Sequence, residues 1–369
     1  MIHLKSSVVI FIVAVLISCL GILSIYSSTH QKDSQPWQDI YKRQMLWVML
    51  GVVVFFILSH LNYRWLWDAT YILYGLAVFL LILVFVLGAT RLGAQRWLRL
   101  AWFNFQPSEF TKLIMVIFFS RYFTRRSVDD ISVISAKFGC KEGLIFPLIF
   151  VAVPALFIYE QPDLGSAAMI LFLFTAILYL TRVKLRYFVI LMLSIILPLP
   201  FMWHFLRDYQ KERLLVFLNP NIDPLGAGYT VIQAKITIGS GGMLGKGWLG
   251  GTQSQLHFLP EAHTDFIFAT FCEEWGLLGS LGLLFLYYLI IRHGFLIAQR
   301  TRDHFASLLA FGVSLMLGIQ IFINIAMNLS LAPVVGLPLP LMSYGGSSII
   351  TTFAALGILA NIDRTRSVF

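Results

Sequence analysis

The sequence predicts an all-α integral membrane protein that crosses the bilayer about ten times. Three observations lead to this fold class. Hydrophobic residues make up 58% of the 369-residue chain and charged residues only 12%, whereas soluble domains carry roughly 25% charged residues. The mean hydropathy is +0.81. The apolar residues form solid runs near the ~18 residues of a spanning helix, and a transmembrane β-barrel would alternate apolar and polar residues instead.

Apolar runs separated by short polar joints are the candidate transmembrane helices. We expect the first to be retained, because no small-residue cleavage site of a signal peptide follows it. An even number of spans would put both termini on one side of the membrane. The ten runs are Val8–Tyr26, Gln44–His60, Ala69–Gly88, Pro107–Tyr122, Leu144–Tyr159, Leu164–Thr181, Tyr187–Leu206, Phe266–Ile291, Phe305–Leu329 and Met342–Ile362.

Basic residues in the joints give the expected orientation. Short joints dense in Lys and Arg, such as residues 182–186, fall on the side of the N-terminus. The positive-inside rule therefore places both termini in the cytoplasm and the long joint, residues 206–264, outside. No appended soluble domain is expected, so residues 1–369 form a single membrane domain. Topology also explains the net charge of +9 without nucleic acid as a partner.

A polar, glycine-rich stretch from Asn219 to Gly276 stands out in this hydrophobic chain, and we expect the chemistry there. Asp265 is the sharpest candidate, because it stands at the outer mouth of the eighth span. A carboxylate at that place could cap the helix N-terminus, where it is favoured, and could also act as a base at a wet membrane surface. The glycines around Lys246 could bring backbone N–H groups close to a phosphate, although their spacing is not that of a Walker loop.

Charged residues in or beside other spans are further candidates. Glu109 and Lys112 lie three residues apart, so they share a helix face. They could form a buried ion pair that fixes helix packing, or line a cavity open to the outer side where Lys112 meets an anionic group. Glu160 and Asp163 flank a Gln-Pro turn, where helix capping or solvation at the interface is the expected role.

Cations in the outer joints are candidates for binding phosphate. Arg96 lies in a short outer joint, against the orientation rule, and a guanidinium offers two parallel donors to phosphate oxygens. Contact with lipid headgroups beside Trp97 and Trp102 is the alternative for it. Arg207 and Arg213 belong to a charge-dense patch that we expect to lie on the bilayer as an amphipathic segment.

Two adjacent acids follow Asp265 in the eighth span. Glu273 and Glu274 lie roughly 12 Å further along the helix, at about 1.5 Å per residue. Their side chains point in different directions, so at least one must find a protein partner or stay protonated. Both could be structural. The sequence has no HExxH pair, serine elbow or CxxC motif, which leaves metalloprotease and redox functions without support.

Short polar and glycine- or proline-containing motifs occur along nearly the whole chain. They are Gly93–Leu98, Gln106–Glu109, Gln161–Gly165, Asp223–Tyr229, Gly245–Trp248, Gly250–Leu256, Phe258–Glu261, His263–Phe268, Pro338–Pro340 and Ser343–Ser347. Together these motifs resemble the SEDS family of membrane proteins (RodA/FtsW/SpoVE). The short tails, Lys246 and the segment Thr252–Leu256 favour its cell-elongation branch over its division branch. The run Asn328–Pro333, where a glycine-containing run is expected, and Cys272 and Trp275 depart from the pattern.

The resemblance implies a ten-spanning peptidoglycan glycosyltransferase that polymerises lipid II at the outer face of the cytoplasmic membrane. It also implies a class B penicillin-binding protein as the partner that cross-links the product. The family's essential aspartate matches Asp265, and its fourth-span acid and lysine match Glu109 and Lys112.

Together with the charge pattern, the resemblance assigns roles to the candidates. Asp265 is expected to be the general base. A divalent cation, Mg²⁺ or Mn²⁺, is a further expectation, although no ligand set is legible. The residues expected to bind the diphosphate substrate are Arg96, Glu109, Lys112, Arg207, Arg213 and Lys246, and the structural or supporting acids are Glu160, Asp163, Glu261 and Glu273.

Two other classes of function remain open at this point. A flippase or transporter of the lipid-linked cell-wall precursor would use the same charges, but it should need polar residues that continue to the inner face. Here they concentrate in the outer half, which favours an enzyme. A non-catalytic scaffold for the partner would leave the outer Arg and Asp residues unexplained.

Overall fold

The structure, a computed structural model, confirms a helical membrane protein, with a helix in each of the ten predicted runs. It describes residues 5–30, 39–91, 94–100, 103–125, 144–181, 185–196, 204, 206, 208–256 and 258–365. The ten helices are α1 (Ser6–Thr29), α3 (Ile40–His60), α4 (Arg64–Leu87), α5 (Pro107–Arg125), α7 (Phe146–Glu160), α8 (Leu164–Leu180), α9 (Leu185–Ile196), α14 (Ile267–Arg300), α15 (His304–Asn328) and α16 (Gly346–Thr365).

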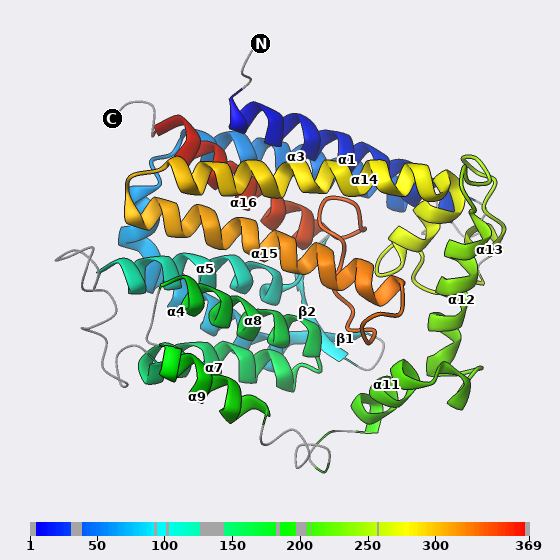
Figure 1. Cartoon of the computed structure of the whole chain (residues 1–369), viewed down its shortest axis with the longest axis horizontal. Helices are drawn as coiled ribbons and strands as arrows, with labels where there is room; N and C mark the ends of the chain where they lie inside the picture. The colour runs from blue at the N-terminus through cyan, green and yellow to red at the C-terminus, as the bar shows by residue number, and fades with distance from the viewer. Residues whose placement is uncertain are drawn as a thin grey trace.

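Most of these helices run side by side in one bundle (Figure 1). Among the described residues, six helices are long and apolar enough to cross a membrane, namely α1, α3, α4, α14, α15 and α16. Close packing joins α16 to α3 and α14 to both α15 and α1. α16 is the most deeply enclosed of the six, and it lies at the centre of the main hydrophobic core, which also includes residues of α1, α14 and α15.

The first and last helices meet at one end of the bundle. The backbone N–H of Ser7 donates to Oδ2 of Asp363 at 2.9 Å. The start of α1 and the end of α16 therefore lie together, as an even number of spans predicts. Which side of the membrane this end faces stays a prediction.

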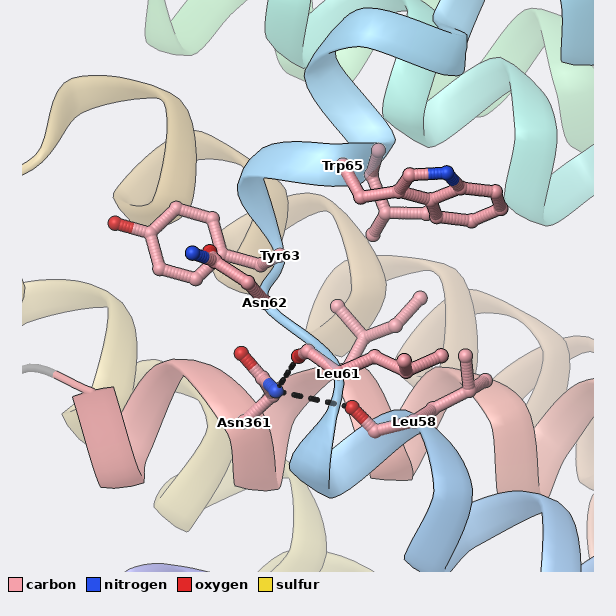
Figure 2. A pocket seen from close by; sticks show the side chains of 8 residues that line it. Leu58, Leu61, Asn62, Tyr63, Trp65 and Asn361 are labelled. Atoms are coloured by element: carbon pink, nitrogen blue, oxygen red, sulfur yellow. Dashed lines mark hydrogen bonds between the residues drawn. The ribbon is translucent and has the colours of Figure 1, made fainter.

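A buried asparagine ties α16 to α3 at this same end. Nδ2 of Asn361 donates to the carbonyl of Leu58 at 3.0 Å and to that of Leu61 (Figure 2). It also donates to the carbonyl of Ser59 at 3.1 Å. The last carbonyls of a helix have no partner within the helix, so Asn361 supplies one from outside. The small hollow beside it is lined by apolar side chains together with Asn62, Tyr63 and Asn361, which makes it a packing feature.

The opposite end of the bundle carries the long joint. It contains α11 (Asp208–Leu218), the 3₁₀ turn Pro220–Ile222, α12 (Ala227–Ser240) and α13 (Thr252–Gln255). These segments stand across the end of the bundle, away from the start of α1 (Figure 1). Most of the charge-dense patch predicted to be an amphipathic segment falls in α11. Asp223 forms the turn before α12, accepting the N–H of Gly226 at 3.0 Å.

A small antiparallel sheet was not predicted. Strands β1 (Gly88–Arg91), β2 (Ala94–Leu100) and β3 (Phe103–Phe105) pair in the order β1-β2-β3. In the register, Leu98 of β2 lies opposite Gly88 on one side and Phe105 on the other. The sheet joins α4 to α5 and presents β2 to the end of the bundle that carries the long joint.

Helix α14 is longer than the predicted run and is broken in its first third. Gly276 has φ 64° and ψ −165°, which is not helical. The backbone groups freed by the break are satisfied by the loop after α12. Glu273 O and Glu274 O accept N–H groups from Lys246 and Gly247, each at 3.0 Å. The N–H groups of residues 277 and 278 donate to the carbonyls of residues 242 and 243 at 2.9 and 3.1 Å.

Candidate functional site

Asp265 lies just before α14, half-buried where several helices end. The helix begins at Ile267 and its N-cap residue, Phe266, makes no side-chain cap. The prediction that Asp265 caps α14 is therefore wrong, because the chain turns two residues before the helix begins. In the part of the chain that the structure describes, no group hydrogen-bonds to its carboxylate.

Burial and nearby charges together determine the pKa of the Asp265 carboxyl group. Burial raises the pKa of this carboxyl group most, and the negative charge of Glu261 raises it further. Arg213 and Arg96 oppose both effects, and the resulting pKa is about 6. A carboxyl group with this pKa is mostly ionised at neutral pH and still accepts a proton readily, as a general base must.

Arg213 reaches this site from α11. Its Nη1 donates to the carbonyl of Val334 at 3.1 Å, in the segment after α15. Burial lowers the pKa of its guanidinium, and the positive charge of Arg96 adds to this effect. Two guanidinium groups that repel each other near one carboxylate would be stabilised by an anion between them. Arg213 also borders a mostly apolar hollow between α11, α12 and Val334.

Arg96 comes from strand β2, so the unpredicted sheet positions a predicted residue. Its Nε donates to the carbonyl of Gln161 at 3.1 Å, and its Nη2 donates to that of Pro162. The side chain is half-buried and bound to the turn before α8. This geometry disfavours the alternative of contact with lipid headgroups. Binding of phosphate by Arg96 stays a prediction.

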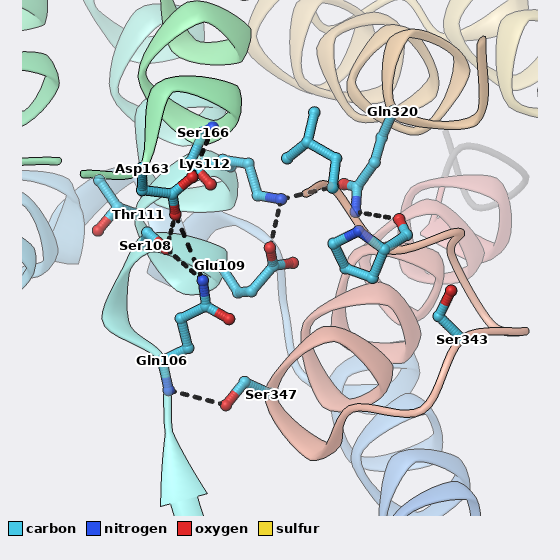
Figure 3. Close-up of polar contacts among 12 residues, drawn as sticks. Gln106, Ser108, Glu109, Thr111, Lys112, Asp163, Ser166, Gln320, Ser343 and Ser347 are labelled. Atoms are coloured by element: carbon cyan, nitrogen blue, oxygen red, sulfur yellow. Dashed lines mark hydrogen bonds and ion pairs between the residues drawn. The ribbon is translucent and has the colours of Figure 1, made fainter. Parts of the chain in front are cut away.

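The prediction that Asp163 caps a helix is confirmed. Its Oδ1 accepts the N–H of Ser166 at 3.1 Å in the first turn of α8, and its Oδ2 accepts Ser108 Oγ at 3.3 Å and Gln106 Nε2 at 3.4 Å (Figure 3). Asp163 thereby holds the starts of α8 and α5 together. Glu160, at the end of α7, is exposed, in keeping with solvation.

Glu109 and Lys112 form the ion pair that their spacing predicts. Lys112 Nζ lies 2.7 Å from Glu109 Oε1 and donates to Gln320 Oε1 of α15 at 3.1 Å (Figure 3). The two residues are only 1% and 2% exposed. This burial favours the ion pair that fixes helix packing over the wall of an open cavity. Contact of either side chain with substrate stays a prediction.

Lys246 and Glu273 pair with each other rather than with Asp265. Their charged atoms are 2.8 Å apart, and Glu273 is fully buried. Glu273 is thus a structural acid that anchors the loop to α14. Its remaining donors are Thr252 Oγ1, Ser240 Oγ, the N–H of Gln253, and the N–H and Oγ of Ser254.

The glycines of the loop shape it instead of binding phosphate. The N–H groups of Lys246 and Gly247 donate to carbonyls of α14, so of the two roles that the sequence leaves open the structure favours shaping. Gly245 has φ +80°, and a Cβ there would lie 2.1 Å from the carbonyl oxygen of Glu274. Only glycine fits this approach. Lys246 Nζ itself binds Glu273 and donates to Thr252 Oγ1 at 2.8 Å, and binding of the diphosphate by Lys246 stays a prediction.

Two predicted candidates, Glu261 and Arg207, remain, together with the adjacent acid Glu274. Glu261 is exposed, and its Oε2 accepts Thr264 Oγ1 at 2.9 Å, so it shapes the turn before Asp265. Glu274 Oε1 accepts the hydroxyl of Ser27 from α1. Arg207 lies outside the described residues. Within the described ranges, no group of three His, Cys, Asp or Glu residues could hold a metal.

Three amides on α15 were missed in the sequence. Gln320, Asn324 and Asn328 are buried, and two of them donate to the backbone carbonyl of Asp265, Asn324 at 3.1 Å and Asn328 at 3.0 Å. A spacing of four places them on one helix face. Polar residues repeated at this spacing in an apolar span are the signal that could have found them, because buried polar groups in a membrane need partners.

The fold and the site define a multi-pass membrane protein with a carboxylate and two guanidinium groups at one end of its helix bundle. A model of the cell cycle protein family FtsW/RodA/SpoVE matches residues 7–368. The chain belongs to this family.

Individual relatives cover almost the whole chain. The peptidoglycan glycosyltransferase MrdB of Escherichia coli (strain K12) is 39% identical over 368 residues, covering 100% of this chain and 95% of its own. The probable peptidoglycan glycosyltransferase FtsW of Geobacter sulfurreducens (strain DL-1 / KN400) is 36% identical over 365 residues, with coverage of 97% and 95%.

Solved structures show the same fold. One, described as the structural coordination of polymerization and crosslinking by a peptidoglycan synthase complex, has a TM-score of 0.79 at 30% identity and covers 97% of both chains. The rod shape determining protein RodA of Thermus thermophilus has a TM-score of 0.69 at 27% identity and covers 97% of this chain and 96% of its own. The chain is a multi-pass inner-membrane protein.

Proposed function

We propose that this protein is a peptidoglycan glycosyltransferase of cell elongation, that it polymerises lipid II at the outer face of the inner membrane, and that Asp265 is its general base. One observation carries the assignment of the base. The carboxylate of Asp265 has a pKa of about 6 and lies in the field of two guanidinium groups, those of Arg213 and Arg96. The names of the curated relatives supply the reaction class.

The reaction joins a sugar hydroxyl to a lipid-linked sugar. The hydroxyl oxygen of the acceptor forms a bond to the anomeric carbon of the donor, while Asp265 takes the hydroxyl proton. The bond between that carbon and the diphosphate oxygen breaks, and the lipid diphosphate leaves with the electron pair. Arg213 and Arg96 stabilise the negative charge of the leaving group, because fixed positive groups aimed at developing charge lower the barrier.

The place of the site suits a substrate that is half lipid and half sugar. Such a donor keeps its tail in the bilayer and its sugars in water, so its diphosphate lies at the interface. Asp265 stands two residues before Ile267, the first residue of α14. Its carboxylate therefore lies at the end of a spanning helix. A reacting centre there can meet both parts of the donor.

A divalent cation and a second protein extend the proposal. We propose that Mg²⁺ or Mn²⁺ arrives with the diphosphate as its counterion, since the described residues offer no ready-made metal site. We also propose a class B penicillin-binding protein transpeptidase as the partner. Support comes from the similar solved structure, whose description joins polymerization to crosslinking in one complex.

Polymerisation of lipid II by the purified chain tests the proposal. Asp265→Asn keeps the size of the side chain and removes the base, so the rate should fall about 10²–10⁴-fold, while the melting temperature stays near that of the wild type. Assays with and without EDTA, and with and without the partner, test the cation and the partner. Wild-type-like glycan strands from Asp265→Asn would refute the base. A wild type that flips lipid II in proteoliposomes without polymerising it would refute the enzyme.

A further inference from the structure

We propose that Asn324 and Asn328 of α15 are positioning residues for Asp265, which hold its backbone in place from the neighbouring helix. This inference rests on the proposed function, because it concerns the placement of the base. It also makes a statement about the fold that can be tested without activity.

Two donors from α15 converge on one carbonyl. Asn324 Nδ2 and Asn328 Nδ2 lie 3.1 and 3.0 Å from the backbone oxygen of Asp265. Both asparagines are fully buried, and they also bond to each other, since Asn328 Nδ2 donates to the Asn324 backbone oxygen at 2.9 Å. A carbonyl held by two fixed donors has little freedom to move, and the side chain that follows from the same Cα is held with it.

Asn328 also fixes the first turn of the helix that follows Asp265. Its Oδ1 accepts the N–H of Ala269 at 3.2 Å. The same N–H also donates to the carbonyl of Phe266 at 3.0 Å, so Asn328 adds a second acceptor from another helix in the first turn of α14, where N–H groups lack full intrahelical partners. Asn328 thus holds Asp265 and the start of α14 with one amide group, donating to the first and accepting from the second.

The same face of α15 also binds the chain segment that follows α15, at residues 337 and 338. Asn324 Nδ2 donates to the carbonyl of Leu337 at 2.7 Å, and Gln320 Nε2 donates to that of Pro338 at 3.0 Å. Gly336, next to these residues, has φ +73°, and a Cβ on it would lie 3.5 Å from Asp265 Oδ2. The amides of α15 therefore set both the carboxylate and the backbone that faces it.

Gln320 connects this arrangement to the enclosed ion pair. Its Oε1 accepts from Lys112 at 3.1 Å while its Nε2 binds the segment under Asp265. Lys112 and Glu109 are therefore linked to the base through one amide group, without contact with substrate. This gives the buried pair a route to influence the site.

The alternative is that these asparagines only satisfy buried backbone groups. Asn361 provides a matched control, because it is also buried and donates to carbonyls at the far end of the bundle, those of Leu58 and Leu61 (Figure 2) and that of Ser59. If the α15 amides were merely structural, Asn324→Ala, Asn328→Ala and Asn361→Ala would all lower the melting temperature and have the same effect on catalysis.

The kinetic test measures kcat and KM for lipid II with the three variants of the full chain. A base displaced by about 1 Å can lose on the order of 10²-fold in rate. We therefore expect kcat to fall at least tenfold in Asn324→Ala and Asn328→Ala with KM changed less than about twofold. Asn361→Ala should keep both values close to those of the wild type.

Hydrogen–deuterium exchange tests the clamp itself. Amides in residues 262–270 and 335–340 should exchange faster in Asn324→Ala and Asn328→Ala, whereas Asn361→Ala should loosen only residues near 58–61. If residues 262–270 and 335–340 exchange as slowly in Asn324→Ala and Asn328→Ala as they do in Asn361→Ala, the inference is overturned. This holds whether or not the wild type is active. In an active enzyme, faster local exchange with unchanged kcat, or lost kcat with unchanged exchange, overturns it as well. A wild type without polymerase activity refutes the proposed function separately.

Discussion

Asp265 carries a carboxyl group whose pKa is raised to about 6, first by burial and next by the charge of Glu261. Only the deprotonated form can accept the proton of an attacking hydroxyl. The rate should therefore rise with pH as this group ionises and level off above its pKa. The pH at half-maximal rate reports on the surroundings of the base.

Replacing Glu261 tests this dependence. In Glu261→Gln the negative charge that raises the pKa of Asp265 is gone, so the pKa falls. The acid limb of kcat/KM against pH should move from near 6 in the wild type to a lower pH. Arg213→Gln removes a charge that lowers this pKa and should move the limb the other way. Acid limbs that coincide in all three proteins would show that another group controls the rate.

Several single residues could be predicted from local spacing alone. The pair Glu109 and Lys112 follows from an interval of three, and the cap at Asp163 follows from an acid placed before an apolar run. The partners of Lys246 and Arg96 could not be predicted in this way. Glu273 and the turn at Gln161 are distant in the sequence, and only the folded chain brings them within hydrogen-bond distance.

Among the elements, the break in α14 is the feature that local hydropathy hides. Apart from Glu273 and Glu274, the residues on both sides of Gly276 are mostly apolar, so the run is predicted as one helix. The conformation with φ 64° and ψ −165° is essentially restricted to glycine. A Cβ at this position would also lie 2.3 Å from the backbone nitrogen of Gly245.

Alanine substitutions separate the break from an ordinary helical glycine. Gly276→Ala should cost at least about 1–3 kcal/mol of stability through backbone strain, with a further cost for the clash. Gly282, in the same helix, has open space where its Cβ would lie, so Gly282→Ala should change stability by no more than about 1 kcal/mol. Thermal unfolding in detergent measures both. Equal melting temperatures for the two variants would contradict the glycine requirement.

The sheet β1-β2-β3 and the amides of α15 were missed for different reasons. The strands at residues 88–91, 94–100 and 103–105 are too short to give a clear alternation beside long apolar runs. The polar residues of α15 stand in an apolar helix, and they are Gln320, Asn324 and Asn328. Two of them bind the carbonyl of Asp265, some 60 residues earlier in the chain, which their own surroundings in the sequence do not reveal. Hydropathy alone reports that a helix is buried, and it does not report what its polar residues bind.

For the whole molecule, composition and run length were enough to predict the membrane fold, while the orientation rests on charge counting. The start of α1 lies beside the end of α16, and Asp265 lies at the other end of the bundle. If the termini are cytoplasmic, the site faces outward, where the glycan strand is built.

Labelling with an impermeant thiol reagent tests this orientation in a variant whose native cysteines are replaced. Leu225, before α12, is 90% exposed, and Arg302, between α14 and α15, is also exposed. Leu225→Cys should react in intact spheroplasts, and Arg302→Cys only after lysis. The reverse pattern would place the site on the cytoplasmic side and refute polymerisation at the outer face.

The break in α14 also has a consequence for how the protein enters the membrane. Its free carbonyl and N–H groups are paired only when residues 242–247 lie against them. Each such group left unpaired in hydrocarbon would cost several kcal/mol. Residues 242–247 are synthesised before α14. The backbone groups that pair with the break are therefore already present when the helix is made. Helix and loop therefore have to insert as one unit, and a deletion within the loop should impair biogenesis before it impairs catalysis.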